Sequence, residues 1–274
     1  MTLFSIDESK CKKDGICVAE CPACLIEMKT PDSNPTPIQG AENLCIKCGH
    51  CVAVCPHAAL TLNFLSPSNC AEVIKSELPS AEQVELLMKS RRSIRTYRDK
   101  PVDRATLERL IEIARHAPSG HNSQPVSWRV YESREELHRL VGITVDWMRF
   151  MVKNAPQIAA MMHFDLVISA WERGKDRILR GAPNLVIAHA PADLMPAQAA
   201  CIIALTYMEL HAASLGLGTC WAGYFNAAAT MYQPMKDALE LPPGHQSFGA
   251  LMMGYPKYPY KRVPARNIPA VSWK

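Results

Sequence analysis

The sequence predicts a two-part protein: a small cysteine-rich module followed by a larger body of the α+β class. Eight of the eleven cysteines lie between Cys11 and Cys55. The charge balance changes along the chain, because residues 1–80 hold six Lys or Arg and nine Asp or Glu, and the remainder holds twenty-four and seventeen. In that remainder, segments with helical spacing of apolar residues precede strand-like segments. We therefore expect a first domain at 1–65, a linker at 66–80 and a second domain at 81–274.

Overall composition excludes several classes of protein. Hydrophobic residues make up 48% and charged residues 20%, which is typical of a globular domain. The N-terminus "MTLFSIDESKCKK" lacks the apolar region of a signal peptide, and the longest apolar stretch is interrupted by Pro196 and Gln198. A net charge of +4 gives no argument for nucleic acid. We expect a cytoplasmic protein with neither a nucleic-acid nor a membrane partner.

The cysteines form two related runs. The second run is C-x2-C-x2-C-x3-C-P, ending at Pro56, which is the spacing of bacterial ferredoxins, and the first run lies 34 residues earlier with aspartate in one cysteine position. The constant offset indicates an internal repeat with two iron–sulfur clusters. In such a repeat the fourth ligand of each run serves the other cluster. One predicted ligand set is therefore Cys45, Cys48, Cys51 and Cys21, and the other is Cys11, Asp14, Cys17 and Cys55.

Asp14 leaves the second of these sets open to three interpretations. Its carboxylate can ligate the fourth iron, the corner can be empty to give a [3Fe–4S] cluster, or Cys24 can take its place. We favour a cluster that loses iron easily at this corner, because carboxylate binds a soft iron–sulfur core less firmly than thiolate. We expect Cys24 to be a buried thiol on a helix after Cys21. Zinc is the alternative for paired cysteines, but it fits the repeated spacing poorly.

The rest of the first domain is predicted to be short strands and loops. "TLFSI" and "ALTLN" are strand-like segments at its two ends. The insert "KTPDSNPTPIQGAEN" is rich in Pro and Asn and is predicted to be a surface loop. "LSPSNCAEVIKSELPS" is predicted to be a connector with one helical turn.

The body opens with a helix and an arginine-rich segment. Ser80 and Gln83 form a capping-box signature, and the helix leads into "RRSIRTYRDKPV". Arginines at this density suit an anionic ligand such as phosphate. Asp103 caps a second helix, which is followed by the polar loop "HAPSGHNSQPVSW" and an alternating strand. The later helix "AACIIALTYMELHAASL" carries an apolar face that suits a core or a dimer interface.

Taken in order, "RRSIRTY", "APSGHNSQPVSW", "GLGTCWAGY" and "GYP" resemble the FMN-dependent nitroreductase family over residues 81–274. The cysteine-rich module resembles the two-cluster ferredoxin domain of some of its members. The resemblance implies an α+β nitroreductase-like fold, with a mixed or antiparallel sheet flanked by helices and a swapped C-terminal arm. It also implies an obligate homodimer whose two subunits complete each FMN site.

The resemblance also implies which residues contact FMN. They come from the arginine segment, the polar loop, the segment after "GLGT" and the tail, and the polar loop would reach the flavin from the partner subunit. In the tail, Arg262 is preferred over Lys261 and Arg266. The implied contacts are Arg91, Arg92, Ser93, Arg95, Pro118, Ser119, Gly120, Asn122, Trp221, Ala222, Gly223, Arg262 and Arg266. No side chain is predicted to be catalytic, because the flavin supplies the chemistry.

The implied function is an iron–sulfur flavoprotein oxidoreductase. Electrons would pass between the clusters and FMN, and a nitroaromatic or quinone-like acceptor would be reduced. The electron donor would be NAD(P)H or a redox protein. The alternative is an electron-transfer module whose FMN relays electrons to or from a partner protein.

Overall fold

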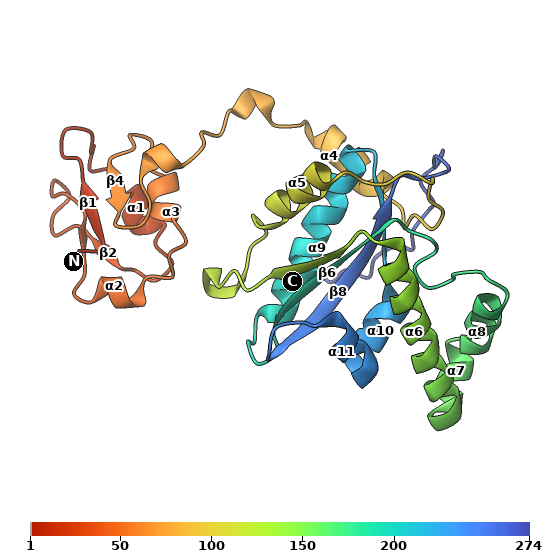
Figure 1. The fold of residues 1–274 in the computed structure, drawn as a ribbon. Coiled ribbons are helices and arrows are strands. Elements are labelled where there is room, and N and C mark those ends of the chain that lie inside the picture. The colour runs from red at the N-terminus through yellow and green to blue at the C-terminus, as the bar shows by residue number, and fades with distance from the viewer. Residues whose placement is uncertain (1) are drawn as a thin grey trace. The chain divides into compact units, whose positions relative to one another are not determined.

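The computed structural model describes residues 2–274 (Figure 1). The chain forms two compact units, one of Met1–Leu78 with His121–Ser123 and one of Pro79–Gly120 with Gln124–Lys274. We call them the cluster unit and the body. No helix within residues 2–274 has both the length and the apolarity needed to cross a membrane.

The cluster unit is built from short elements. Strands β1 (Phe4–Ile6) and β4 (Leu60–Leu62) pair antiparallel, with Phe4 opposite Leu62, so the expected terminal strands are confirmed. One-turn helices α1 (Ile16–Ala19) and α3 (His50–Ala53) follow corresponding positions of the two cysteine runs. The buried apolar residues of this unit form one small core: Leu3, Phe4, Cys17, Leu25, Ile26, Ala41, Val52, Leu60 and Leu62.

The backbone of the cluster unit repeats with the sequence. Gly15 (φ 71°) and Gly49 (φ 75°) are 34 residues apart and precede α1 and α3. The same offset relates two more pairs with left-handed backbone, which are Lys13 with Lys47 and Cys24 with Ala58. Equivalent turns therefore place equivalent ligands. The prediction for Cys24 was wrong: it lies in a turn after α1, with φ 53°, and its side chain is exposed.

The insert between the cysteine runs has more structure than the predicted loop. Strand β2 (Ile26–Glu27) pairs with β3 (Thr36–Pro37), and helix α2 (Ala41–Leu44) follows with Ala41 fully buried. Two residues of pairing are too short to produce a periodic pattern, so these strands were not predicted. The connector contains two 3₁₀ turns, at Pro67–Asn69 and Lys75–Glu77, where one helical turn was expected.

The body is built on a four-stranded antiparallel sheet in the order β5-β6-β8-β7. Its strands are β5 (Ser127–Tyr131), β6 (Asn184–Pro191), β7 (Gly218–Trp221) and β8 (His245–Gly254). Strands β6 and β8 are central and mostly buried, because helices cover both faces of the sheet.

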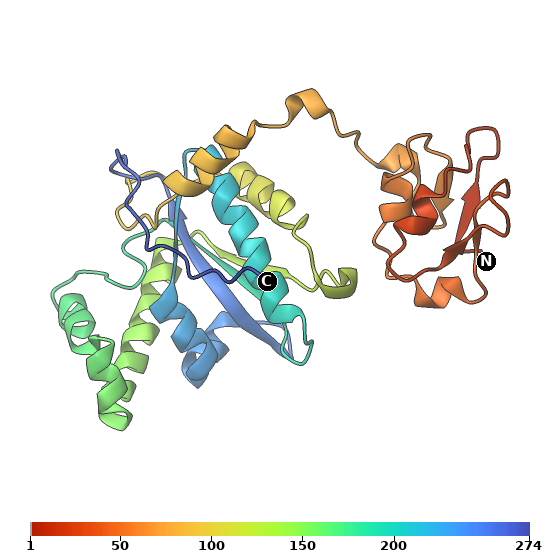
Figure 2. The ribbon, with the colours of Figure 1, turned by 180° about the vertical axis from the view of Figure 1, so that it is seen from behind.

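Alternate residues of the central strands enter two separate cores (Figures 1 and 2). Leu185, Ile187 and Met252 pack on one side, with helices α6 (Arg134–Asn154), α8 (Phe164–Glu172), α10 (Gly223–Met231) and α11 (Gln233–Leu239). Val186 and Leu251 pack on the other side, with α5 (Arg104–Ala114) and α9 (Ala197–Ser214). Helix α7 (Pro156–Met161) joins α6 to α8. The body is thus three layers, and the predicted α+β class is confirmed.

The predicted helix starts are also confirmed. Helix α4 (Ala81–Ser90) begins after a complete capping box, in which Ser80 Oγ accepts from the Gln83 N–H and the Gln83 side chain accepts from the Ser80 N–H. Asp103 caps α5 through the Thr106 N–H at 2.8 Å. Both caps satisfy amide groups that the first helical turn leaves unpaired.

The C-terminal segment leaves the sheet after β8. Residues 257–274 form neither helix nor strand, and their side chains from Lys257 onward are exposed (Figure 2, dark blue). Proline at three positions of this segment opposes helix formation.

Candidate functional site

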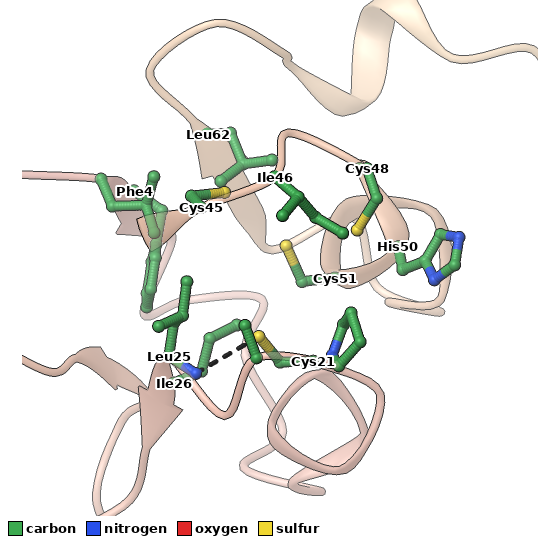
Figure 3. A pocket seen from close by; sticks show the side chains of 14 residues that line it. Phe4, Cys21, Leu25, Ile26, Cys45, Ile46, Cys48, His50, Cys51 and Leu62 are labelled. Atoms are coloured by element: carbon green, nitrogen blue, oxygen red, sulfur yellow. Dashed lines mark hydrogen bonds between the residues drawn. The ribbon is translucent and has the colours of Figure 1, made fainter. Parts of the chain in front are cut away.

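Four cysteines of the cluster unit surround one cavity. Cys21 comes from the turn after α1, and Cys45, Cys48 and Cys51 come from the second run. Figure 3 shows their sulfur atoms facing the same space, with Phe4, Leu25 and Leu62 closing its apolar side. The structure therefore brings together three ligands of one run and the fourth ligand of the other.

A second cavity holds the complementary set. Its lining includes Cys11, Asp14, Cys17 and Cys55, together with His57. Asp14 lies among the thiols, and one of its oxygens, Oδ1, accepts from the Ile16 N–H at 3.2 Å. Cys24 lines neither cavity. The grouping matches the crossed sets expected from the repeat.

Backbone amides donate to sulfur in both runs. The Leu25 N–H donates to Cys21 Sγ at 3.3 Å, and its repeat equivalent, the Ala59 N–H, donates to Cys55 Sγ at 3.4 Å. The Lys47 N–H donates to Cys45 Sγ at 3.4 Å. Such bonds stabilise thiolate, and hydrogen bonds to cluster sulfur are one of the means by which proteins set cluster potentials. These donors fit the iron–sulfur interpretation.

Burial and mutual repulsion keep the thiols of both sets neutral unless a cation is bound. Burial raises the pKa of the Cys51 thiol to about 11, and the neighbouring Cys48 adds to the rise. Burial also raises the pKa of Cys17, with further contributions from Cys55, Asp14 and Cys11. Thiolates gathered this closely repel one another, so all four in a set can ionise only around positive charge. Among the described residues, no group of three or more His, Cys, Asp or Glu side chains is arranged to hold a single metal ion.

In the body, the arginine segment is fixed against the sheet. The Ile94 N–H donates to the Thr219 carbonyl at 2.9 Å, and Gly218 leaves no room for a Cβ, which would lie 2.4 Å from Ile94 Cγ1. The Arg98 N–H donates to the Tyr255 carbonyl at 2.8 Å. These contacts hold residues 91–98 beside β7 and the end of β8.

A cavity lies between this segment and the chain after β8. Arg91 and Arg92 line it together with Thr219, Tyr258 and Tyr260. Arg95 lines an adjoining cavity that shares Ile94 and both tyrosines, and the half-buried Ser93 lies between Arg92 and Ile94 in the chain. We call these two spaces together the arginine cavity.

One donor of Arg92 lacks a hydrogen-bond partner. Arg92 donates through Nη2 to the Lys89 carbonyl at 2.7 Å, but its buried Nε has no partner within residues 2–274. A buried donor without a partner is costly. An anionic ligand in this cavity would meet guanidinium groups and would fit the donors present.

The segment after "GLGT" lies next to this cavity. Trp221 ends β7 and is 37% exposed as a residue, and Ala222 is buried with its N–H donating to the Ala250 carbonyl. Gly223 is the first residue of α10, and a Cβ there would have nothing within 4 Å. The N–H groups of the first turn of α10 have no partner inside the helix and suit a polar ligand edge.

Other predicted flavin contacts do not line the arginine cavity. Pro118, Ser119, Gly120 and Asn122 follow α5; Ser119 Oγ accepts from the Gln124 N–H, and Gly120 packs against Pro196. Arg262 and Arg266 are exposed in the C-terminal segment.

Two features of the site were missed by sequence reasoning. Tyr258 and Tyr260 line the cavity beside the arginines. Glu209, which the apolar helix α9 buries to 6% exposure, bonds to Arg91, and a single acid in an otherwise apolar helix was the available signal.

Comparisons with known proteins match both units. Residues 88–255 match the model of the nitroreductase family, and residues 9–60 match that of a 4Fe-4S dicluster domain. An NADH dehydrogenase of Thermus thermophilus is 29% identical over 67% of this chain and 92% of its own. A 4-nitrobenzoate reductase of a Nocardioides species is 41% identical over 20% of this chain and 21% of its own.

Among solved structures, an FMN-bound nitroreductase of Bacteroides fragilis superposes with a TM-score of 0.55 at 24% identity, over 69% of this chain and 99% of that one. This likeness supports the fold of the body. The match to the family model over residues 88–255 shows that this chain belongs to the nitroreductase family, and the match over residues 9–60 shows that it has a 4Fe-4S dicluster domain at its N-terminal end.

Proposed function

We propose that the protein is an FMN-dependent, iron–sulfur oxidoreductase that reduces a small organic acceptor. FMN, when bound, supplies chemistry that couples one-electron and two-electron transfers. The clusters of the first domain (1–65) would exchange single electrons with FMN in the second domain (81–274). The linker 66–80 joins the two domains. A nitroaromatic or quinone-like compound is the proposed acceptor.

The single observation that supports this function best is the arginine cavity. Arg91 and Arg92 line it, and both residues are only partly buried, so their guanidinium groups can donate to a ligand there. Arg95 in the adjoining space adds a further donor. Phosphate and the pyrimidine edge of FMN are acceptors of the kind that guanidinium groups bind. We assign Arg91, Arg92, Ser93 and Arg95 to these contacts, and Trp221, Ala222 and Gly223 to the flavin ring.

The predicted contacts that do not line the arginine cavity would be supplied within a homodimer. Pro118, Ser119, Gly120 and Asn122 would reach the flavin from the partner subunit, and Arg262 or Arg266 would meet its phosphate. Among the described strands, β5 pairs with β6 alone, so one edge of the sheet is open. The C-terminal segment exposes large apolar side chains such as Ile268 and Trp273, which a partner subunit would cover.

The ligand sets support two clusters of different stability. Cys21, Cys45, Cys48 and Cys51 supply four thiolates to one [4Fe–4S] cluster. Cys11, Cys17 and Cys55 with Asp14 supply three thiolates and a carboxylate, so we propose that this cluster is Asp-ligated and converts readily to [3Fe–4S].

Anaerobic purification of the full chain tests the proposal. We expect FMN and acid-labile sulfide in the same preparation, and steady-state reduction of a nitroaromatic or quinone with NAD(P)H or a reduced redox protein as donor. A preparation lacking flavin after reconstitution would refute the proposal. Bound cofactors without turnover of any small acceptor would instead indicate a relay to a partner protein.

A variant pair separates the two units. Cys48→Ser should lower the rate with a one-electron donor, since it removes a cluster ligand, and should leave flavin content unchanged. Cys70→Ser is the matched control, because Cys70 lines neither cluster cavity. Equal rates in both variants would show that the clusters are not part of the electron-transfer path.

A further inference from the structure

Helix α9 buries one carboxylate that the proposed flavin contacts do not include. Glu209 is the only acidic residue of α9, and its neighbours on the buried face are apolar, such as Leu205 and Met208. Carboxylates are almost never this buried unless they are paired. A buried charge at this position therefore needs an explanation.

Three donors surround the Glu209 carboxylate. Oε1 accepts from Arg91 Nη1 at 2.9 Å and from Thr219 Oγ1 at 3.1 Å. Oε2 accepts from Trp221 Nε1 at 3.4 Å. The donors come from the end of α4 and from β7, so one carboxylate joins three elements of the body.

The same donors border the arginine cavity. Arg91 and Thr219 line it, and Trp221 is two residues beyond Thr219 on the same strand. Arg91 keeps 25% of its side chain exposed, and its contact with Glu209 uses one of five guanidinium hydrogens. Arg91 can therefore hold Glu209 and still donate into the cavity.

The opposite end of the indole is fixed as well. A Cβ on Gly249 would lie 2.9 Å from Trp221 Cζ3, so the ring packs directly on the backbone of β8. With Nε1 bonded to Glu209, the indole is held at both ends. Its exposed part then presents one face in one orientation.

We propose that Glu209 is a positioning residue that orients the Arg91 guanidinium and the Trp221 indole for the flavin and sets the charge around it. The inference rests on the proposed FMN site. Glu209 offsets one of the positive charges beside the cavity, and a negative charge close to a flavin opposes its reduction. Its removal should therefore make the flavin easier to reduce.

The test compares Glu209→Gln with Glu112→Gln in the full chain. Both changes remove one negative charge from the body. Glu112, however, lies on α5, is exposed and pairs with Arg115. Compared with the wild type, Glu209→Gln should raise the ratio of the affinities for reduced and oxidised FMN about tenfold. This corresponds to a rise of about 30 mV in the midpoint potential of a two-electron couple. Glu112→Gln should match the wild type.

A second measurement shows whether the effect passes through Arg91. In a double-mutant cycle, Arg91→Gln and Glu209→Gln should give non-additive changes in midpoint potential, because the two residues are in contact. In cofactor-free protein, the Trp221 indole N–H resonance should move in Glu209→Gln and stay in place in Glu112→Gln. If Glu209→Gln does not fold, Thr219→Val removes one donor without changing charge and should move the same resonance.

The outcomes separate the two proposals. If the wild type binds no FMN, the proposed function and this inference both fall. If the wild type binds FMN, and Glu209→Gln and Glu112→Gln have equal affinities, potentials and indole resonances, the positioning role alone is refuted. Additive changes in the cycle would likewise refute positioning through Arg91.

Discussion

Replacing Gly249 by alanine should destabilise the body and move the indole of Trp221. Gly249 lies on the central strand β8, where a Cβ would come within 2.6 Å of Leu205 Cδ1 and 2.9 Å of Trp221 Cζ3. Both distances are shorter than carbon atoms tolerate without movement. The end of Leu205 can rotate, but the indole is rigid and bonded to Glu209, so the strain falls on the ring.

The magnitude follows from two opposing effects. Inserting a methyl group into a packed core costs about 1–3 kcal/mol. Alanine also restricts the unfolded chain and recovers about 0.4–1 kcal/mol. We expect a net loss of about 1–2 kcal/mol, which lowers Tm by about 2–8 °C for a domain of this size.

Gly142→Ala is the matched control for this prediction. Gly142 lies inside α6, and a Cβ there would have only Trp171 Cζ2 in range, at 4.0 Å, which is an ordinary contact. The same substitution should stabilise this position by about 0.5–1 kcal/mol, because glycine disfavours helix interiors. The two substitutions should therefore change the free energy of unfolding in opposite directions.

Urea unfolding of the full chain, followed by circular dichroism and by tryptophan emission, measures both effects. Gly249→Ala should unfold at lower urea with altered native emission, and Gly142→Ala at higher urea with native emission unchanged. If Gly249→Ala is as stable as the wild type and keeps its emission, the packing of Trp221 on β8 is wrong.

Three further predictions concern the cluster unit and the sheet. Cys21→Ser should abolish the paramagnetic signal of the cluster that the second run holds, and Cys55→Ser should abolish the signal of the cluster that the first run holds. If each variant instead loses the signal of the cluster held by the run in which the substitution lies, crossed ligation is wrong. Asp14→Cys should retain more iron after exposure to air than the wild type, measured as iron per chain, and equal loss would show that Asp14 does not weaken its corner. His189 is 3% exposed and its Nδ1 lies 3.0 Å from His245 Nδ1. Burial, with His245 and Arg129 nearby, lowers the pKa of His189 to about 4. Because the unfolded chain binds the proton more tightly, stability should fall as pH drops from about 6.5 to about 4. In this pH range the midpoint of urea unfolding should vary less with pH in His189→Gln than in the wild type. The same dependence of the midpoint on pH in both proteins would disprove the effect.

The sequence by itself determined the features that depend on neighbouring residues. The two runs specify equivalent turns, because cluster ligands lie within eleven residues of one another and Gly15 and Gly49 supply left-handed backbone where the chain must turn. The starts of α4 and α5 were predictable because a cap acts over three residues. The class of the body was implied by the resemblance of its ordered motifs to a known family.

Only the tertiary structure decided which distant residues meet. Arg91 and Glu209 are 118 residues apart, and neither sequence context indicates the other. The arginine segment was predicted to face an anionic ligand, whereas one of its guanidinium groups also compensates a buried carboxylate. The need for glycine at position 249 is likewise invisible in sequence, because it arises from an indole on the adjacent strand β7. Such contacts depend on how β7, β8 and α9 pack, and packing is a property of the whole fold rather than of any single segment.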